Sequence, residues 1–91
     1  MRQAALVTGS SRGIGFAAAE ALAREGFAIA INGPAEDDEL REAITRVEAL
    51  GAPCVAAPFD VTDLSVHAAA LGRIEDAIGP LTTLVNNAGV G

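Results

Sequence analysis

The sequence has 91 residues, of which 51% are hydrophobic and 20% are charged, and its formal net charge is −6. A chain of this length forms one domain at most. The negative charge argues against a nucleic acid or an anionic membrane surface as a partner, because both favour a basic patch.

Four short apolar runs predict β-strands at residues 4–7, 27–31, 53–59 and 81–85. The first three are nearly continuous in apolar residues, as strands covered on both faces tend to be. None of these runs is long enough to cross a membrane. The short apolar start after residue 3 also does not have the form of a secretory signal.

Longer segments with helical spacing lie between the runs, and they predict helices over residues 13–25, 37–50 and 63–78. Acidic residues in the first turn of the second helix suit the positive end of a helix dipole. The spacing in the first helix predicts one apolar face, made of Ile14, Ala17, Ala18, Ala21 and Leu22. The other two stripes are Leu40, Ile44 and Val47, and Leu71, Ile74 and Ile78.

The alternation of strands and helices predicts an α/β fold with a parallel sheet, in the order βαβαβαβ. Pro58 lies inside the third strand, and a proline is tolerated in a strand only where it need not donate to a central ladder. The strand order 3-2-1-4 places this strand at an edge. We therefore expect a doubly wound sheet with the first two helices on one face and the third on the other.

A glycine-rich segment, "TGSSRGIG" at residues 8–15, joins the first strand to the first helix. A doubly wound fold holds a dinucleotide pyrophosphate at this junction, because the glycines let the phosphates approach the backbone. Glycine turns also occur for purely structural reasons, but the position between a strand and an amphipathic helix favours a phosphate site.

Two further segments follow the third and fourth strands. "NNAG" at residues 86–89 borders the crevice beside the first strand, where its asparagines can bridge backbone groups or bond a ribose. Asp60 and Val61 end the third strand, where the carboxylate can accept from an adenine amino group and the Val61 N–H can donate. Asp60 can equally well begin the turn into the next helix.

Together these segments resemble the short-chain dehydrogenase/reductase family. "TGSSRGIG" is similar to the family's glycine motif, "NNAG" to its next signature and "DVTD" to its adenine-contact segment, with most likeness to 3-oxoacyl-[acyl-carrier-protein] reductases. The resemblance implies the N-terminal half of a Rossmann-type domain and a nicotinamide cofactor that exchanges hydride with a carbonyl or alcohol. The cofactor-binding residues that it implies are Gly9, Ser11, Arg12, Gly13, Ile14, Gly15, Asn32, Asp60, Val61, Asn87, Ala88 and Gly89.

The family's catalytic serine, its Tyr-x-x-x-Lys pair and the helix asparagine of its proton relay lie beyond the part of the family that this sequence resembles. The sequence itself contains no tyrosine and no lysine. We therefore expect residues 1–91 to supply cofactor binding as part of a complete enzyme and to be inactive alone. The alternatives are a stand-alone dinucleotide-binding module and a truncated inactive product. No residue is assigned to catalysis or to a metal, and His67 is expected to be a surface or half-buried helix residue.

Cofactor preference is predicted from the end of the second strand, where NAD enzymes place an acidic residue on the ribose 2′-OH. Here Asn32 and Gly33 occupy that position, and Arg12 can pair with a 2′-phosphate. This pattern favours NADP over NAD, although Glu36, Asp37 and Asp38 follow closely.

The remaining expectations concern compartment and partners. Cys54 is the sole cysteine, which excludes an internal disulfide and fits a reducing, cytoplasmic compartment. Residues 81–85 would leave an unpaired strand edge, so we expect them to pair with the rest of the domain or with a partner chain. The complete protein is expected to form a homo-oligomer and to act on a small carbonyl substrate.

Overall fold

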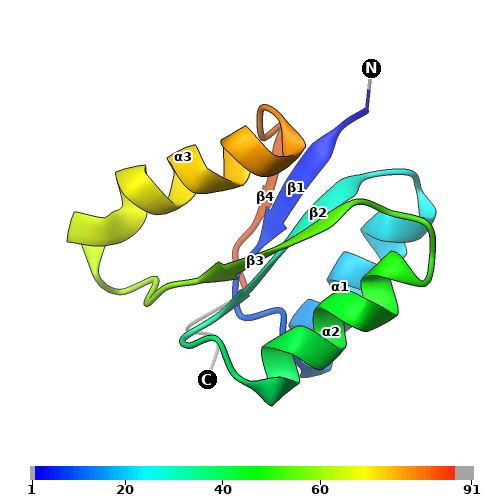
Figure 1. Ribbon diagram of the computed structural model, residues 1–91, viewed down its shortest axis with the longest axis horizontal. Helices are drawn as coiled ribbons and strands as arrows, with labels where there is room; N and C mark the ends of the chain where they lie inside the picture. Colours follow the sequence, from blue (N-terminus) through cyan, green and yellow to red (C-terminus); the bar gives the residue numbers. More distant parts are fainter. Residues whose placement is uncertain (1, 88–91) are drawn as a thin grey trace.

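The computed structural model describes residues 2–87 and shows strands and helices alternating along the chain (Figure 1). The strands are β1 (Ala4–Val7), β2 (Ala28–Gly33), β3 (Cys54–Pro58) and β4 (Thr83–Val85). The helices are α1 (Gly13–Arg24), α2 (Asp38–Glu48) and α3 (His67–Ile78), with a short 3-10 turn, η1 (Leu64–Val66), before α3.

All neighbouring strands of the sheet are parallel, and their order is β3-β2-β1-β4. Both the fold class and the strand order predicted from the sequence are thereby confirmed. Pro58 is the last residue of the edge strand β3, opposite Gly33 of β2. At that place its missing N–H removes no bond from a central ladder, which is the reason a proline is tolerated there.

The sheet separates two helical layers: α1 and α2 cover one face and α3 covers the other (Figure 1). Successive side chains of a strand point to opposite faces, so each central strand contributes to two cores. Val7 and Ile31 pack on the side of α1 and α2. Leu6 and Ala30 pack on the side of α3. The near-continuous apolar runs of β1 and β2 follow from this double coverage.

The predicted apolar face of α1 is only partly correct: Ala18 and Leu22 pack against the core, whereas Ile14, Ala17 and Ala21 are exposed. The residues that the structure buries are Gly15, Phe16, Ala19 and Ala23, whereas Ile14 is 80% exposed. An alanine-rich helix carries several overlapping apolar stripes, so periodicity alone cannot select one of them. The close approach of Gly15 to the backbone of Gly9 selects the face that lies against the sheet.

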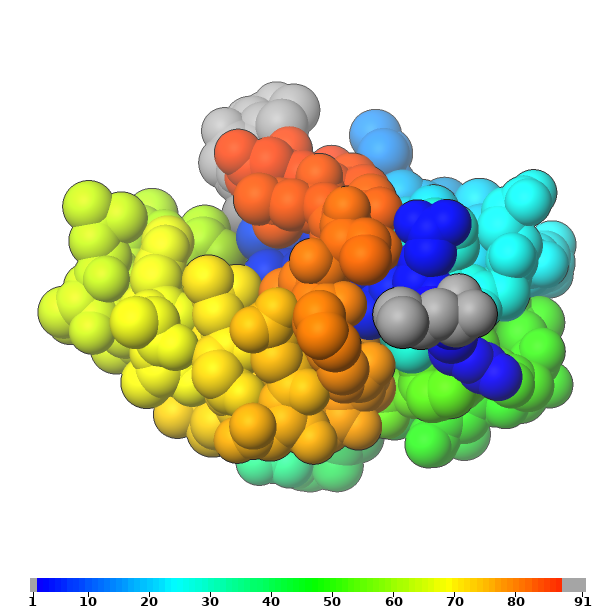
Figure 2. Space-filling view, turned by 90° about the horizontal axis from the view of Figure 1, so that it is seen from above, coloured from blue at the N-terminus to red at the C-terminus, as the bar shows by residue number. Residues whose placement is uncertain are grey.

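The helix α2 buries Leu40 and Val47 as predicted, whereas α3 begins later than residue 63 because η1 precedes it. Leu71 of α3 and Leu84 of β4 remain exposed, and both line a recess of about 310 Å³ beside β4. Figure 2 shows the orange-red atoms of β4 and its flanking residues at the surface, beside the yellow and orange atoms of α3. Within residues 2–87, β4 pairs with β1 alone.

Candidate functional site

The candidate site lies at the carboxyl ends of the strands, where the chain leaves β1 toward α1. The chain passes from β1 to β2 on one side, whereas β4 lies on the other side of β1. This is the switch point at which the strand order reverses, and open α/β sheets bind their ligands in the crevice outside it. The loop of residues 8–12 forms the floor of that crevice.

Glycines in this loop are required for two separate physical reasons. Gly9 and Gly13 have φ angles of 61° and 62°, in the left-handed region that residues with a Cβ rarely adopt. Gly15 is required for space, since a Cβ there would lie 2.3 Å from the carbonyl oxygen of Gly9 and 2.7 Å from Nδ2 of Asn87. The glycines therefore bring the first turn of α1 directly against the loop.

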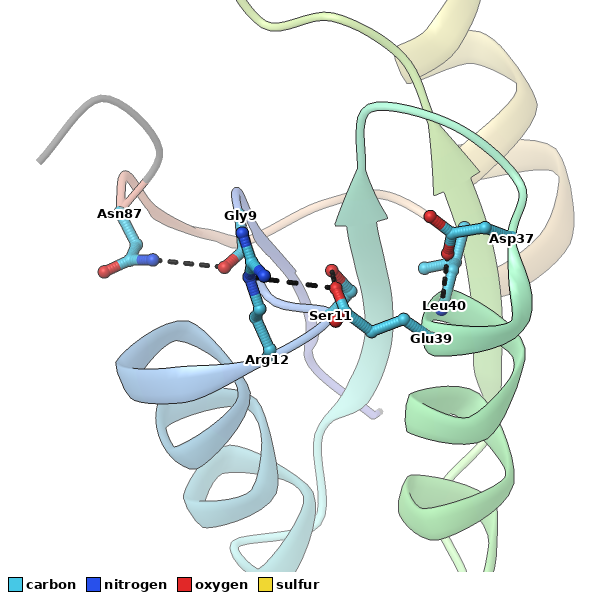
Figure 3. A network of polar contacts seen from close by, with 7 residues as sticks. All are labelled: Gly9, Ser11, Arg12, Asp37, Glu39, Leu40 and Asn87. Carbon is cyan, nitrogen blue, oxygen red and sulfur yellow. Dashed lines mark hydrogen bonds and ion pairs between the residues drawn. The ribbon is translucent and has the colours of Figure 1, made fainter. Parts of the chain in front are cut away.

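The N-terminus of α1 is suited to binding an anion. Its N-cap residue, Arg12, is extended and makes no side-chain capping bond, and the first turn contains no acidic residue. The N-terminus of α2 is the opposite case, because Asp37 accepts a hydrogen bond from the Leu40 N–H at 2.9 Å and Asp38 and Glu39 follow it (Figure 3). The uncapped N–H groups and the dipole of α1 can therefore hold a phosphate, whereas α2 already carries its own carboxylates.

Asn32 lies at the end of β2 and is only 2% exposed. Its Oδ1 accepts from the Gly9 N–H at 2.8 Å, and its Nδ2 donates to the carbonyls of Ala57 at 2.9 Å and Phe59 at 3.1 Å. The side chain thus connects the glycine loop to β3 across β2. The sequence predicts that Asn32 binds the cofactor, whereas in the structure its side-chain amide forms hydrogen bonds with other residues of the protein.

Ser10 is a site residue that the sequence analysis did not single out. It is fully buried, and its Oγ donates to the Val7 carbonyl at 2.6 Å and accepts from the Asn32 N–H at 2.9 Å. Its own N–H donates to the Asn32 carbonyl at 2.8 Å. Ser10 therefore fixes the loop against β1 and β2 from inside. A small hydroxyl residue between two turn residues is too common to reveal this role from the sequence.

The segment after β4 is joined to the same loop. The Asn87 N–H donates to Oγ1 of Thr8 at 2.9 Å, and Nδ2 of Asn87 donates to the Gly9 carbonyl at 3.1 Å (Figure 3). Of the two functions considered for these asparagines, the structure shows the bridging of backbone groups. Ala88 and Gly89, also predicted to bind the cofactor, lie outside the described residues.

Asp60 and Val61 follow β3 on the far side of the crevice. Asp60 accepts from the N–H of Thr62 at 2.9 Å and from its hydroxyl at 2.6 Å, so its carboxylate begins a turn. These two bonds, the hydroxyl first, hold the pKa of Asp60 below its ordinary value. One oxygen of the carboxylate accepts both bonds, and the residue is exposed to solvent.

Val61 lines a largely apolar cavity of about 390 Å³ that extends to Thr8 and Leu84. His67 borders the same cavity, where its Nε2 lies 2.8 Å from the Val61 carbonyl and its ring packs edge-on against Phe59. Because a carbonyl only accepts, Nε2 carries the proton in this contact. His67 is half-buried, as expected, and it fixes the backbone of Val61.

A second recess, of about 210 Å³, separates the glycine loop from α2. Ser11 donates from Oγ to Oε1 of Glu39 at 3.1 Å, and Nε of Arg12 lies 3.8 Å from the same oxygen (Figure 3). Glu39 is another residue that the sequence analysis missed, although it belongs to the acidic first turn of α2. Among the described residues, no group of three or more His, Cys, Asp or Glu side chains could hold a metal ion.

Comparison with known proteins places this geometry in a family. The sequence profile of a family described as short chain dehydrogenase matches residues 3–91. The chain belongs to the short-chain dehydrogenase family. The expected likeness to 3-oxoacyl-[acyl-carrier-protein] reductases is confirmed: the structure of such a reductase from Brucella melitensis in complex with NAD superposes with a TM-score of 0.91 at 38% identity. The superposition covers 100% of this chain and 35% of that one.

Two other members extend the comparison. The 5-keto-D-gluconate 5-reductase of Escherichia coli strain K12 is 46% identical over 86 residues, which are 93% of this chain and 33% of the relative. L-sorbose reductase of Gluconobacter frateurii, complexed with NADPH and L-sorbose, superposes with a TM-score of 0.89 at 35% identity, over 99% of this chain and 34% of that one. The chain thus spans about a third of the length of the curated relatives it matches. Within residues 2–87, no helix is both long and apolar enough to cross a membrane.

Proposed function

We propose that residues 1–91 form the first half of a Rossmann domain and bind the dinucleotide of an NAD(P)-dependent oxidoreductase. The observation that carries the proposal is the N-terminus of α1, which has neither a side-chain cap nor an acidic residue. Gly9 in the preceding loop and Gly13, the first residue of the helix, both have positive φ. An anion held there would satisfy N–H groups that the helix itself leaves without acceptors. The family membership of the chain supports the same conclusion.

The residues divide between the parts of the dinucleotide. Residues 9–15 would hold the pyrophosphate, and the cavity beside Asp60 and Val61 would receive the adenine, whose apolar faces match its lining. A ribose would lie near residues 87–89. Asn32 would act by positioning Gly9 rather than by touching the cofactor. The bound nicotinamide supplies hydride transfer, and residues beyond this chain would supply the proton transfer to a small carbonyl substrate.

We propose a preference for NADP on two features of the loop. Arg12 is 83% exposed and extends from the loop, so a 2′-phosphate can reach its guanidinium. Gly33, at the end of β2, has no carboxylate that could accept from a ribose 2′-OH or repel a 2′-phosphate. Relatives with each cofactor are known, one complexed with NAD and one with NADPH.

The outer edge of β4 is the proposed junction with further polypeptide. An unpaired strand edge invites another strand, and Leu84, at 64% exposure, lies beside it with Leu71. The relatives are about three times as long as this chain, which supports the remainder of the same domain as the occupant. A partner chain is the alternative. A homo-oligomer and a cytoplasmic location complete the proposal.

The test places a charge at the N-terminus of α1 in the natural polypeptide that carries this sequence. Ile14 is exposed in the first turn, so Ile14→Glu adds a carboxylate beside the proposed pyrophosphate without disturbing the core. We expect both NAD and NADP to bind about tenfold more weakly by calorimetry, and Ile14→Gln, of equal size but neutral, to lose much less. Equal affinity of the Glu and Gln variants would refute the phosphate site.

Two further measurements decide between the enzyme and its alternatives. Carbonyl-dependent oxidation of NADPH or NADH by the natural polypeptide would support the enzyme. Dinucleotide binding without turnover, with an intact mass equal to residues 1–91, would favour a stand-alone binding module. Loss of both binding and turnover would favour a truncated inactive product.

A further inference from the structure

We propose that Glu39 limits the preference of this site for NADP by competing with the 2′-phosphate of NADP for Arg12. The inference rests on the proposed dinucleotide function and concerns a residue of α2, outside the glycine motif. Glu39 would weaken NADP binding while leaving the binding of NAD nearly unchanged. It would therefore be a specificity-determining residue.

The geometry shows two consecutive loop residues directed at one carboxylate oxygen. Oε1 of Glu39 accepts from Oγ of Ser11 at 3.1 Å and lies 3.8 Å from Nε of Arg12 (Figure 3). Ser11 and Glu39 are 28 positions apart in the sequence, so the contact is tertiary. The carboxylate is thus held at the loop by a hydrogen bond from Ser11, within ion-pair distance of Arg12, the residue proposed to bind the 2′-phosphate.

The end of β2 explains why the carboxylate comes from α2. NAD-binding sites of this fold place an acidic side chain at the end of the second strand. Here that position is Gly33, where an added Cβ would lie only 3.3 Å from Oγ of Ser11. The backbone of β2 therefore approaches Ser11 closely at Gly33, and the carboxylate of Glu39 contacts the same serine from α2. Glu39 restores an acidic group to a place where the strand has none.

Charge determines the direction of the effect. A 2′-phosphate that pairs with Arg12 must displace Glu39 from the guanidinium, and the loss of that ion pair opposes NADP. A ribose 2′-OH can instead donate to a carboxylate, so NAD meets no such penalty. The Arg12 and Glu39 side chains are 83% and 47% exposed, so water and salt screen their interaction. The expected effect is therefore modest and dependent on salt.

The test uses two nucleotides that differ only in the 2′-phosphate, adenosine 2′,5′-bisphosphate and adenosine 5′-monophosphate. Their affinities for the natural polypeptide are measured by calorimetry, for the wild type and for Glu39→Gln, whose amide oxygen can still accept from Ser11. We expect Glu39→Gln to tighten the bisphosphate by about three- to tenfold and to change the monophosphate less than about twofold. In high salt the gain should shrink.

Glu42→Gln is the matched control, because Glu42 borders the same recess on α2 and loses the same charge. It should shift the bisphosphate by less than about twofold. In an Arg12→Ala background the gain from Glu39→Gln should disappear. An equal gain from both Gln variants, a gain that survives Arg12→Ala, or no gain would each overturn the role of Glu39. Failure of the wild type to bind any of these nucleotides, NAD or NADP would overturn the dinucleotide proposal and this inference with it.

Discussion

Replacing Asn32 with alanine should strongly destabilise the protein at the carboxyl edge of the sheet. The substitution removes an acceptor from the Gly9 N–H and a donor from the Ala57 and Phe59 carbonyls. A buried polar group left without a partner costs about 1–3 kcal/mol, and Ala57 and Phe59 are both buried. Because water can accept from the Gly9 N–H in the variant, we expect a loss of about 3 kcal/mol in the free energy of unfolding.

The assay is urea unfolding of the natural polypeptide, followed by far-UV circular dichroism and read from the midpoint at a constant slope. Asn32→Asp keeps an acceptor for Gly9 but turns a carboxylate oxygen toward two carbonyls, so it should destabilise at least as much as alanine. Asn86→Ala is the control, since that exposed amide receives one bond, from Thr8 at 3.2 Å. A loss below about 1 kcal/mol for Asn32→Ala would show that water replaces these bonds.

Two other predictions concern residues with contrasting environments. Gly15→Ala should destabilise the protein by about 1–3 kcal/mol in the same assay and weaken dinucleotide binding, since its Cβ would meet the Gly9 carbonyl at 2.3 Å. The control is Gly72→Ala, in a helix and facing open space, which should be neutral or slightly stabilising. Equal effects of the two substitutions would contradict the packing argument. Burial, aided by the Glu48 carboxylate, raises the pKa of Cys54 from 9.0 to about 12. Peptide mapping should therefore show alkylation by iodoacetamide at pH 8 at least about a hundredfold slower in the folded than in the urea-unfolded protein. The contribution of the neutral Cys54 thiol to the free energy of unfolding is present below pH 9 and is lost as the pH rises toward 12. Rapid alkylation of the folded protein would contradict the raised pKa of Cys54.

The layers and the strand order could be predicted because each follows from a local signal. Alternating strand and helix patterns limit the topology to parallel units, and Pro58 independently assigns β3 to an edge. The glycine loop was predictable for the same reason, since a turn between a strand and a helix needs Gly9 and Gly13 at positive φ. These features depend on neighbours that are close in the sequence.

The features that were missed depend on contacts between distant residues. The buried face of α1 was only partly predicted, because Ile14 is apolar but lies exposed in the first turn of the helix. The contact of Glu39 with Ser11 joins two elements whose relative placement the sequence does not encode locally. The same holds for Asn32, which has the residue type of a ligand contact but directs its amide to Gly9 and β3. Residue type predicted participation in the site, and only tertiary geometry showed the role.

The polar groups at the crevice divide into those that build it and those that remain for a ligand. The amides of Asn32 and Asn87, the hydroxyl of Ser10 and the Asp60 carboxylate all bond within the chain. The first turn of α1 has N–H groups without a side-chain cap, and the Arg12 side chain is largely exposed. A loop that holds N–H donors without acceptors needs rigid support from the protein, because the phosphate of the cofactor stabilises the loop only while it is bound. The internal bonds supply that support, so variants of Asn32 or Ser10 should weaken every dinucleotide alike, whereas variants of Arg12 and Glu39 should separate NADP from NAD.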